Sequence, residues 1–288
     1  MTSIQLDRIA LEDVGVNPQR LAEAIHEQLG EGVGAVPVRQ IALALDIVDI
    51  REQPLTNFEA ALVTTPERDY GEIVLNLNSS PQRRRFSLGH ELLHFLNSGH
   101  EQTEAGGFWC SRADMMTSSA TQDRHVRQEA EANAFAIELL APRKRLRPYL
   151  RAEASLQSVL RMASDLDISR EAATRRFVNL HPDELAAVFR KNGQFIYAER
   201  GSGFPKLSLR RGQPLNVGSG PEGSLSVFEE VDPNDWLSGR PGVNQLSMQT
   251  LQQRNGHSIT LLRTIVPDDE DDPGIDDAYE RFVRGHAR

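Results

Sequence analysis

A His-Glu-x-x-His motif at residues 90–94 is the part of the sequence best suited to chemistry. Residues four apart on an α-helix lie one above the other, so His90 and His94 can present two imidazoles to one metal ion. Glu91 would then lie beside the metal, where a general base for an activated water belongs. The motif stands in an apolar run, 86–96, with helical spacing and no proline. Burying these side chains without a metal is costly, so the pattern favours a zinc-dependent peptidase over a core helix with two satisfied histidines.

A catalytic zinc site needs a third protein ligand, and one candidate lies close to the motif. His100 follows His90 by ten residues and gives His-Glu-x-x-His-x-x-Asn-x-x-His, which is similar to the metzincin pattern with Asn97 where glycine is usual. A turn at Asn97 could bring His100 back to the metal. Met115 or Met116 could then imitate the metzincin Met-turn.

The other candidate lies on a second predicted helix, which ends at Pro142. Glu129 and Asn133 are four residues apart there, so the carboxylate can bind zinc while the amide orients another ligand. Glu131 points away from that pair and is expected to be solvated. The residues alone leave both Glu129 and His100 open as third ligand.

Composition and charge bound the class of protein. A chain of 288 residues is long enough for about two domains, and a net charge of −9 disfavours nucleic-acid binding over the whole surface. The single cysteine, Cys110, excludes an internal disulfide and suits a reducing cytoplasm. It could block a bound zinc, but a lone cysteine is more often a small packing residue. No apolar run approaches the ~20 residues of a membrane span, and no signal peptide is evident, so we expect a cytoplasmic protein with no membrane segment.

Helices and strands are predicted on both sides of the motif. The segments before it are helices at 18–29 and 37–45, a strand at 47–50, and paired strands at 60–65 and 72–78. The polar stretch 97–127 has weak periodicity, which is typical of an irregular lid or substrate-facing loop. His125, within it, is our candidate for stabilising an oxyanion.

The segment 143–180 reads as short helices, of which the last two resemble a helix-turn-helix pair. It carries nine basic and four acidic side chains in an acidic chain. DNA contact and a packing pair with a solvated basic face both stay open. Short strands follow and predict a small C-terminal α/β domain with strands at 186–190, 194–198, 225–228 and 258–262. Residues 267–288 predict an acidic tail.

The strand at 71–76, the segment 84–94 and the helix at 129–142 together resemble the ImmA/IrrE-type metallopeptidases. The likeness covers roughly residues 20–180. The departures are Gly89 and Ala141 in place of alanine and methionine, and Leu93 in place of glycine; none removes a chemical group. The resemblance implies a zincin-like α+β fold with His90, His94 and Glu129 as zinc ligands and Glu91 as catalytic base.

The resemblance also implies an organisation and a substrate. The expected parts are a zinc metallopeptidase domain at 1–142, a helix-turn-helix-like segment at 143–181, a GAF-like sensor domain at 182–266 and the tail at 267–288. The expected activity is zinc-dependent cleavage of a helix-turn-helix transcriptional repressor in a stress or signal response. The alternative is a DNA-binding transcriptional regulator that uses residues 143–180.

Overall fold

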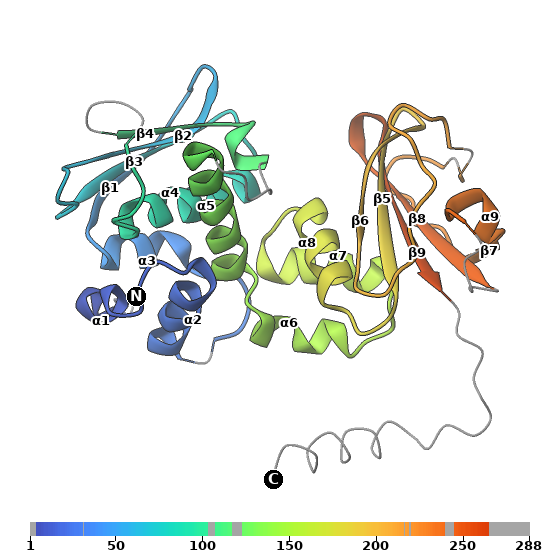
Figure 1. Ribbon diagram of the computed structural model, residues 1–288, viewed down its shortest axis with the longest axis horizontal. Helices are drawn as coiled ribbons and strands as arrows, with labels where there is room; N and C mark the ends of the chain where they lie inside the picture. Colours follow the sequence, from blue (N-terminus) through green and yellow to red (C-terminus); the bar gives the residue numbers. More distant parts are fainter. Residues whose placement is uncertain are drawn as a thin grey trace, which may run out of the picture. The chain divides into compact units, whose positions relative to one another are not determined.

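The computed structural model describes residues 4–30, 32–102, 107–116, 123–215, 217–218, 220–239 and 245–264. The chain forms two compact units that divide after Pro182, and each unit contains its own β-sheet (Figure 1). The protein is therefore a mixed α+β protein, as predicted. The predicted acidic tail, 267–288, lies outside the described residues. No helix in the described ranges combines the length and apolar character that a membrane span requires.

The N-terminal unit contains most of the described helices. They are α1 (Arg8–Glu12), α2 (Pro18–Leu29), α3 (Val38–Ala44), α4 (Pro81–Leu96), α5 (Arg124–Leu140), α6 (Arg143–Leu150), α7 (Leu156–Leu166), α8 (Arg170–Leu180) and the 3₁₀ turn η1 (Asp114–Met116). Local signals set where the long ones begin. Ser80 caps α4, which has proline at its first position, and Asp123 caps α5. The helix predicted from residue 129 thus begins five residues earlier.

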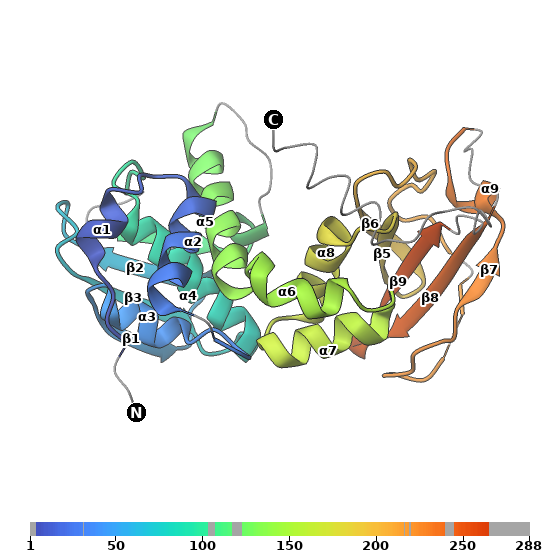
Figure 2. The ribbon, with the colours of Figure 1, turned by 90° about the horizontal axis from the view of Figure 1, so that it is seen from below.

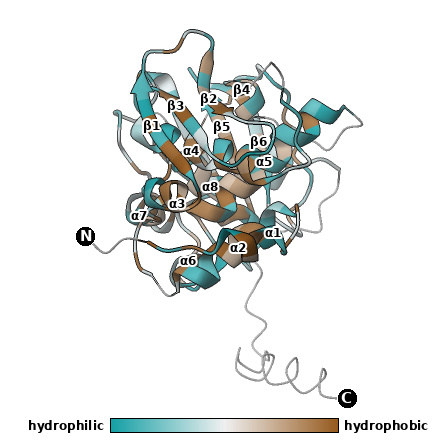
Figure 3. Cartoon of the chain, turned by 90° about the vertical axis from the view of Figure 1, so that its left-hand side faces the viewer, coloured by the Kyte–Doolittle hydropathy of each residue, from teal (hydrophilic) through white to brown (hydrophobic). Residues whose placement is uncertain are grey.

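A four-stranded sheet covers α4 in this unit. Its strands are β1 (Ile47–Gln53), β2 (Phe58–Thr64), β3 (Gly71–Asn76) and β4 (Gly107–Ser111). They lie in the order β1-β3-β2-β4, which Figure 3 shows from the side, and only the β1–β3 pair is parallel. The first three strands confirm the sequence prediction. β4 was missed, because it lies inside the stretch expected to be irregular.

The edge strand β4 approaches β2 very closely at its first residue. A Cβ atom on Gly107 would lie 2.7 Å from the backbone oxygen of Leu62, so only glycine fits without a shift of the strand. The register then pairs Cys110 with Ala60. Alternation along the strand buries Phe108 and Cys110 and leaves Trp109 partly exposed.

Helices α4 and α5 pack against each other, and α4 also packs on β2 and β3. The contact is close at Gly89, where a Cβ atom would lie 3.4 Å from the Cα atom of Ala136 and 3.5 Å from its Cβ atom. Small residues at both positions let the two backbones approach. This approach places the histidines of α4 beside the acidic residues of α5.

Helices α6, α7 and α8 continue the N-terminal unit after α5 (Figure 2). A left-handed residue, Asp167, ends α7, and Ser169 caps α8, which produces the predicted pair of helices with a short turn. The pair packs through buried apolar residues such as Leu166 and Phe177. These helices belong to the same compact unit as the His-Glu-x-x-His helix.

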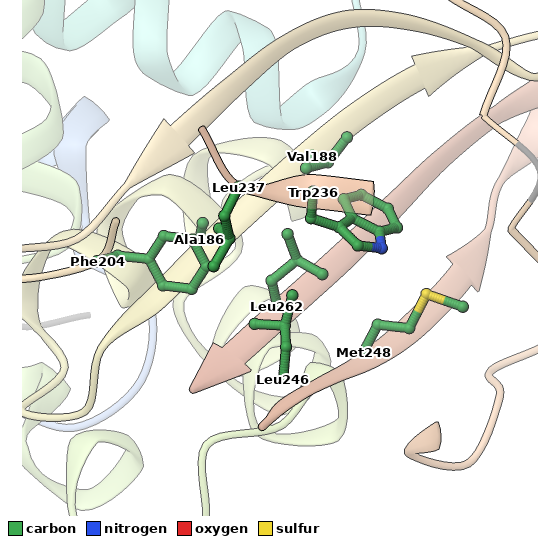
Figure 4. Packing of buried hydrophobic residues seen from close by; sticks show 8 residues of the cluster. All are labelled: Ala186, Val188, Phe204, Trp236, Leu237, Leu246, Met248 and Leu262. Carbon is green, nitrogen blue, oxygen red and sulfur yellow. The ribbon is translucent and has the colours of Figure 1, made fainter. Parts of the chain in front are cut away.

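The C-terminal unit is built on an antiparallel sheet in the order β6-β5-β9-β8-β7. Its elements are β5 (Leu185–Lys191), β6 (Gln194–Arg200), β7 (Glu229–Val231), α9 (Pro233–Trp236), β8 (Leu246–Gln252), η2 (Arg254–Gly256) and β9 (His257–Thr264). Trp236 and Leu237, at and just after the end of α9, pack on Leu246, Met248 and Leu262 of the sheet (Figure 4). The predicted strand at 225–228 is an isolated bridge at Leu225, and β8 was not predicted. The GAF-like assignment stays a prediction.

The close contact between α4 and α5 predicts a size limit at Gly89. Gly89→Ala should keep the fold and raise stability by up to about 1 kcal/mol, because alanine favours the helix and its Cβ atom fits. Gly89→Leu should lower the free energy of unfolding by about 1–3 kcal/mol by overpacking the contact. Urea unfolding of the two variants measures both effects. A Gly89→Leu protein as stable as wild type would contradict a tight contact here.

Candidate metal centre

Three ligand atoms converge between α4 and α5. The Nε2 atom of His90 lies 3.1 Å from the Nε2 atom of His94 and 3.1 Å from Oε2 of Glu129. The Nε2 atom of His94 lies 3.4 Å from Oε1 of Glu129, and all three side chains are buried. Atoms that bind a tetrahedral zinc at 2.0–2.1 Å lie roughly 3.3–3.4 Å apart, so the spacing fits this ion.

Asn133 fixes the orientation of His90. The Nδ2 atom of Asn133 donates to the backbone oxygen of Asp114 at 3.0 Å, which turns its Oδ1 atom toward Nδ1 of His90 at 2.9 Å. An amide oxygen only accepts, so Nδ1 of His90 carries the proton. In the neutral ring this leaves the lone pair on Nε2, facing Glu129. The pairing of Glu129 and Asn133 on one helix face agrees with the role expected for the amide.

His100 and Glu131 fix the orientation of His94. Nε2 of His100 lies 3.0 Å from Oε2 of Glu131, and Nδ1 of His100 lies 2.8 Å from Nδ1 of His94. A carboxylate accepts from Nε2–H of His100, and burial lowers the pKa of His100, so its ring is neutral and its Nδ1 accepts. His94 must then donate through Nδ1 and keep a lone pair on Nε2.

His100 and Glu131 lie in positions that differ from those expected from the sequence. His100 lies behind His94, and the four-residue group of possible metal ligands that converges here does not include it. Glu131 was expected to be solvated. Its side chain is instead only 34% exposed and accepts a hydrogen bond from His100. Both residues therefore orient His94 rather than stand at the convergence point.

The hydrogen-bond chains leave three electron pairs directed at one buried space. The lone pairs of the two Nε2 atoms and of the Glu129 carboxylate face one another, and no proton lies between them when both rings are neutral. The repulsion is relieved by a metal cation or by a proton on His90, whose pKa is raised because its contact with Glu129 outweighs burial. Two imidazoles and one carboxylate form a donor set that suits zinc and leaves a fourth position. The residues present therefore fit the ion that the sequence predicted.

The electrostatics of the cluster follow from burial and close contacts. Burial lowers the pKa of His94 to about 3, so the ring is neutral near pH 7. Burial alone would raise the pKa of Glu129, but the contacts of its carboxylate with His90 and His94 outweigh this and hold the pKa below its usual range. Burial acts to lower the pKa of His90, but the contact with Glu129 outweighs it and raises that pKa. An ionised carboxylate and a neutral imidazole are the forms that bind a metal.

Glu91 lies beside this cluster and finds no nitrogen or oxygen hydrogen-bond donor within the described part of the chain, although the thiol of Cys110 lies close to it. Both of its carboxylate oxygens are buried. Burial raises the pKa of Glu91 to about 7, although the nearby His90 acts in the opposite direction. A buried carboxylate with a pKa near neutrality is suited to exchange protons with a reacting group. This is the position that the motif predicted for a general base.

Arg68 holds the chain that leaves α4, and no sequence motif indicated this role. Its guanidinium is buried and donates to the backbone oxygens of Asn97 and His100. It also lies over the ring of Phe108, with 5.5 Å from Cζ to the centroid. Phe108 in turn stacks on the imidazole of His94 at a centroid distance of 4.6 Å. Arg68 thereby fixes the turn that points His100 toward His94.

Cys110 lies next to the metal ligands. Its Sγ atom and the ligand atoms of His90, His94 and Glu129 all lie within 4.8 Å of one another. The side chain is 2% exposed, and burial together with the carboxylates of Glu91 and Glu129 raises the pKa of its thiol well above the usual value. This position is compatible with both roles that the sequence left open for Cys110, a group that could block zinc and a small packing residue.

The remaining sequence candidates lie around the cluster. His125 is half-exposed and begins the helix turn that leads to Glu129, with 3.8 Å between its Nδ1 atom and Oε1 of Glu129. Its Nε2 atom lies 3.3 Å from Oδ1 of Asp114. Met115 is buried, and its Sδ atom accepts from the hydroxyl of Ser87 at 3.2 Å. The side chain of Met116 is outside the described part of the structure.

Comparison with known proteins agrees with this site. Residues 46–178 match the family model of the IrrE N-terminal-like domain, Peptidase_M78. Within these residues the match confirms the resemblance drawn from the motifs. No curated protein matches the sequence significantly.

A solved structure shares the fold more broadly. A Mycobacterium tuberculosis transcriptional regulator aligns with a TM-score of 0.51 and 13% identity, over 86% of this chain and 88% of that chain. At this identity the likeness is one of fold.

The orienting chains predict a graded loss of metal affinity. His100→Ala and Asn133→Ala should each weaken zinc binding 10–100-fold, because residues that orient a ligand have effects of this size. Glu129→Ala should weaken binding more than either. Competition with a chelator measures all three, and His257→Ala, an exposed histidine of the C-terminal unit, serves as control. An affinity of His100→Ala as low as that of Glu129→Ala would mean that His100 binds the metal itself.

Proposed function

We propose that the protein is a zinc-dependent endopeptidase with His90, His94 and Glu129 as metal ligands and Glu91 as general base. One observation carries the proposal. The two Nε2 atoms and the Glu129 carboxylate converge on one buried space, beside the buried carboxylate of Glu91. The Peptidase_M78 domain that contains these residues supports the same activity.

The chain's own groups divide the work of peptide hydrolysis. When bound, zinc supplies a Lewis acid that polarises a carbonyl and lowers the pKa of water. Glu91 takes the proton from the attacking water and delivers it to the leaving nitrogen. Burial keeps the pKa of its carboxyl near neutrality, so it can both accept and release a proton. His125, half-exposed beside Glu129, is our candidate for stabilising the oxyanion.

Strand β4 is where we expect an extended substrate to bind. It is an edge strand of the described sheet and pairs only with β2 there, so the N–H and C=O groups on its other side are available to a further strand. An extended peptide can pair with such an edge through its main chain. Trp109, 37% exposed and 5.6 Å from the ring of Phe58, offers an apolar surface next to this edge.

The proposed substrate is a helix-turn-helix transcriptional repressor, cut in a stress or signal response. The support is the match of residues 46–178 to the IrrE N-terminal-like domain, since the site geometry alone does not distinguish one protein substrate from another. We propose that the C-terminal unit is a sensor or a docking element for this substrate. Its separate core allows it to fold as its own module.

The alternative function is DNA binding by residues 143–180. Some of the basic side chains there bind the protein itself: Arg176 pairs with Glu138, and Arg145 donates to the backbone oxygen of Gly34. Others, including Arg147 and Arg170, are exposed. The helix pair therefore serves at least in part as a packing element. A measurement of operator binding tests whether its exposed basic side chains also contact DNA.

Substitution of the proposed general base separates metal binding from catalysis. Glu91→Gln should keep zinc but lower the cleavage rate by roughly 10²–10⁴-fold, because the amide cannot accept the proton of water. The measurement is zinc content together with cleavage of purified repressors encoded near this gene. Glu131→Gln, which lies outside the reacting space, should cut far faster than Glu91→Gln.

Two outcomes would contradict the proposal. Cleavage by Glu91→Gln at the wild-type rate would exclude this site as the peptidase centre. Regulation that survives Glu91→Gln, together with operator binding that weakens steeply with salt, would favour the DNA-binding alternative.

A further inference from the structure

We propose that Cys110 is a fourth protein ligand of the metal site and that its thiolate closes the site at rest. This inference rests on the zinc site proposed above and adds a residue that the His-Glu-x-x-His motif does not include. Occupation of the fourth coordination position by the thiolate would prevent water from binding to the metal.

The placement of Cys110 is the first observation. Its Sγ atom and the ligand atoms of His90, His94 and Glu129 all lie within 4.8 Å of one another. Ligand atoms around a tetrahedral zinc lie roughly 3.3–3.7 Å apart, so a shift of about 1 Å at most completes the set. Two imidazoles, one carboxylate and one thiolate are all ligands that zinc accepts.

The strand that carries Cys110 makes this placement specific. The close approach of Gly107 to the Leu62 backbone and the pairing of Cys110 with Ala60 fix β4 on β2. Alternation then directs Cys110 inward and Trp109 outward. A residue that only filled space could be any small apolar side chain, whereas the thiol is the one soft metal ligand that the chain contains besides its methionines.

Glu91 supplies an independent observation. Its carboxylate is fully buried and finds no nitrogen or oxygen donor in the described structure, while the Cys110 thiol lies close enough to interact with it. The thiol and this carboxylate therefore lie beside the three nitrogen and oxygen ligands. Two buried carboxylates, Glu91 and Glu129, that gather beside two imidazoles and a thiol indicate that this space suits a cation.

Ligation by Cys110 has a functional consequence. Catalytic zinc sites have three protein ligands and an open position, whereas sites with four protein ligands are closed. Zinc binds cysteine as the thiolate, so ligation breaks the S–H bond and releases its proton to solvent. The thiol takes a proton back when it leaves. The resting protein therefore holds its metal tightly without activating water, and displacement of the thiolate opens the site.

X-ray absorption at the zinc edge tests this directly. The chain has one cysteine, so a sulfur neighbour at about 2.3 Å from zinc in the wild-type protein can come only from Cys110 or a methionine. We expect one such sulfur. It should disappear in Cys110→Ala, replaced by a nitrogen or oxygen neighbour, and persist in Met115→Leu, which controls for the buried thioether nearby. A zinc-loaded wild-type protein with only nitrogen and oxygen neighbours would overturn the proposal.

Affinity and rate give a second readout. Cys110→Ala should bind zinc at least tenfold more weakly in chelator competition, yet cleave several-fold faster when fully loaded. Slower cleavage by the loaded variant would overturn the closing role. The two proposals fail separately: a wild type without a sulfur neighbour removes the Cys110 ligand alone, whereas cleavage by Glu91→Gln removes the peptidase function alone. A wild-type protein that takes up no zinc would overturn both.

Discussion

The close packing of α4 on α5 is the constraint on which the site depends. The helix period alone places His90 above His94 and Glu129 above Asn133, but each pair lies on a separate helix. Small residues where the helices meet, Gly89 and Ala136, let the two faces come close enough for nitrogen and oxygen atoms to converge. A larger residue at this contact would push the two helices apart and separate the ligand atoms, although the ligand side chains themselves would be unchanged. The spacing of the metal ligands is thus set by the size of two residues that bind nothing.

Hydrogen-bond chains that run outward from the ligands determine their chemistry. Each begins at an atom whose donor or acceptor role is fixed, the Glu131 carboxylate or the Asn133 amide held by a backbone oxygen. From that end the tautomer of each histidine follows, and both rings present a lone pair inward. Arg68 stabilises one chain from outside by binding the backbone of the turn that carries His100. Metal affinity therefore depends on residues two contacts away from the metal.

The parts of the site with a short-range signal could be predicted, and those that depend on distant contacts could not. The motif and the four-residue spacing on α5 identified the convergent histidines and glutamate, because helix geometry is local. His100 has the spacing of a ligand, yet its direction depends on Arg68, 32 residues earlier in the chain. β4 was missed because its pairing with β2 spans some 50 residues and its own sequence is short and weakly alternating. The role of Glu131 was also missed, because its partner, His100, lies outside helix α5.

Strand β4 joins the two proposals in one element. Its outer edge is the expected binding site of an extended substrate, and its inward face carries the thiol expected to close the metal site. A peptide that pairs with the outer edge adds hydrogen bonds along the whole strand, and interiors as tightly packed as this one transmit small shifts. A shift of about 1 Å in the position of the Cys110 Sγ atom is enough to change it from a metal ligand to an unbound neighbour of the metal. Substrate binding and release of the thiolate therefore act on the same five residues, which would restrict water activation to the time when a peptide is bound.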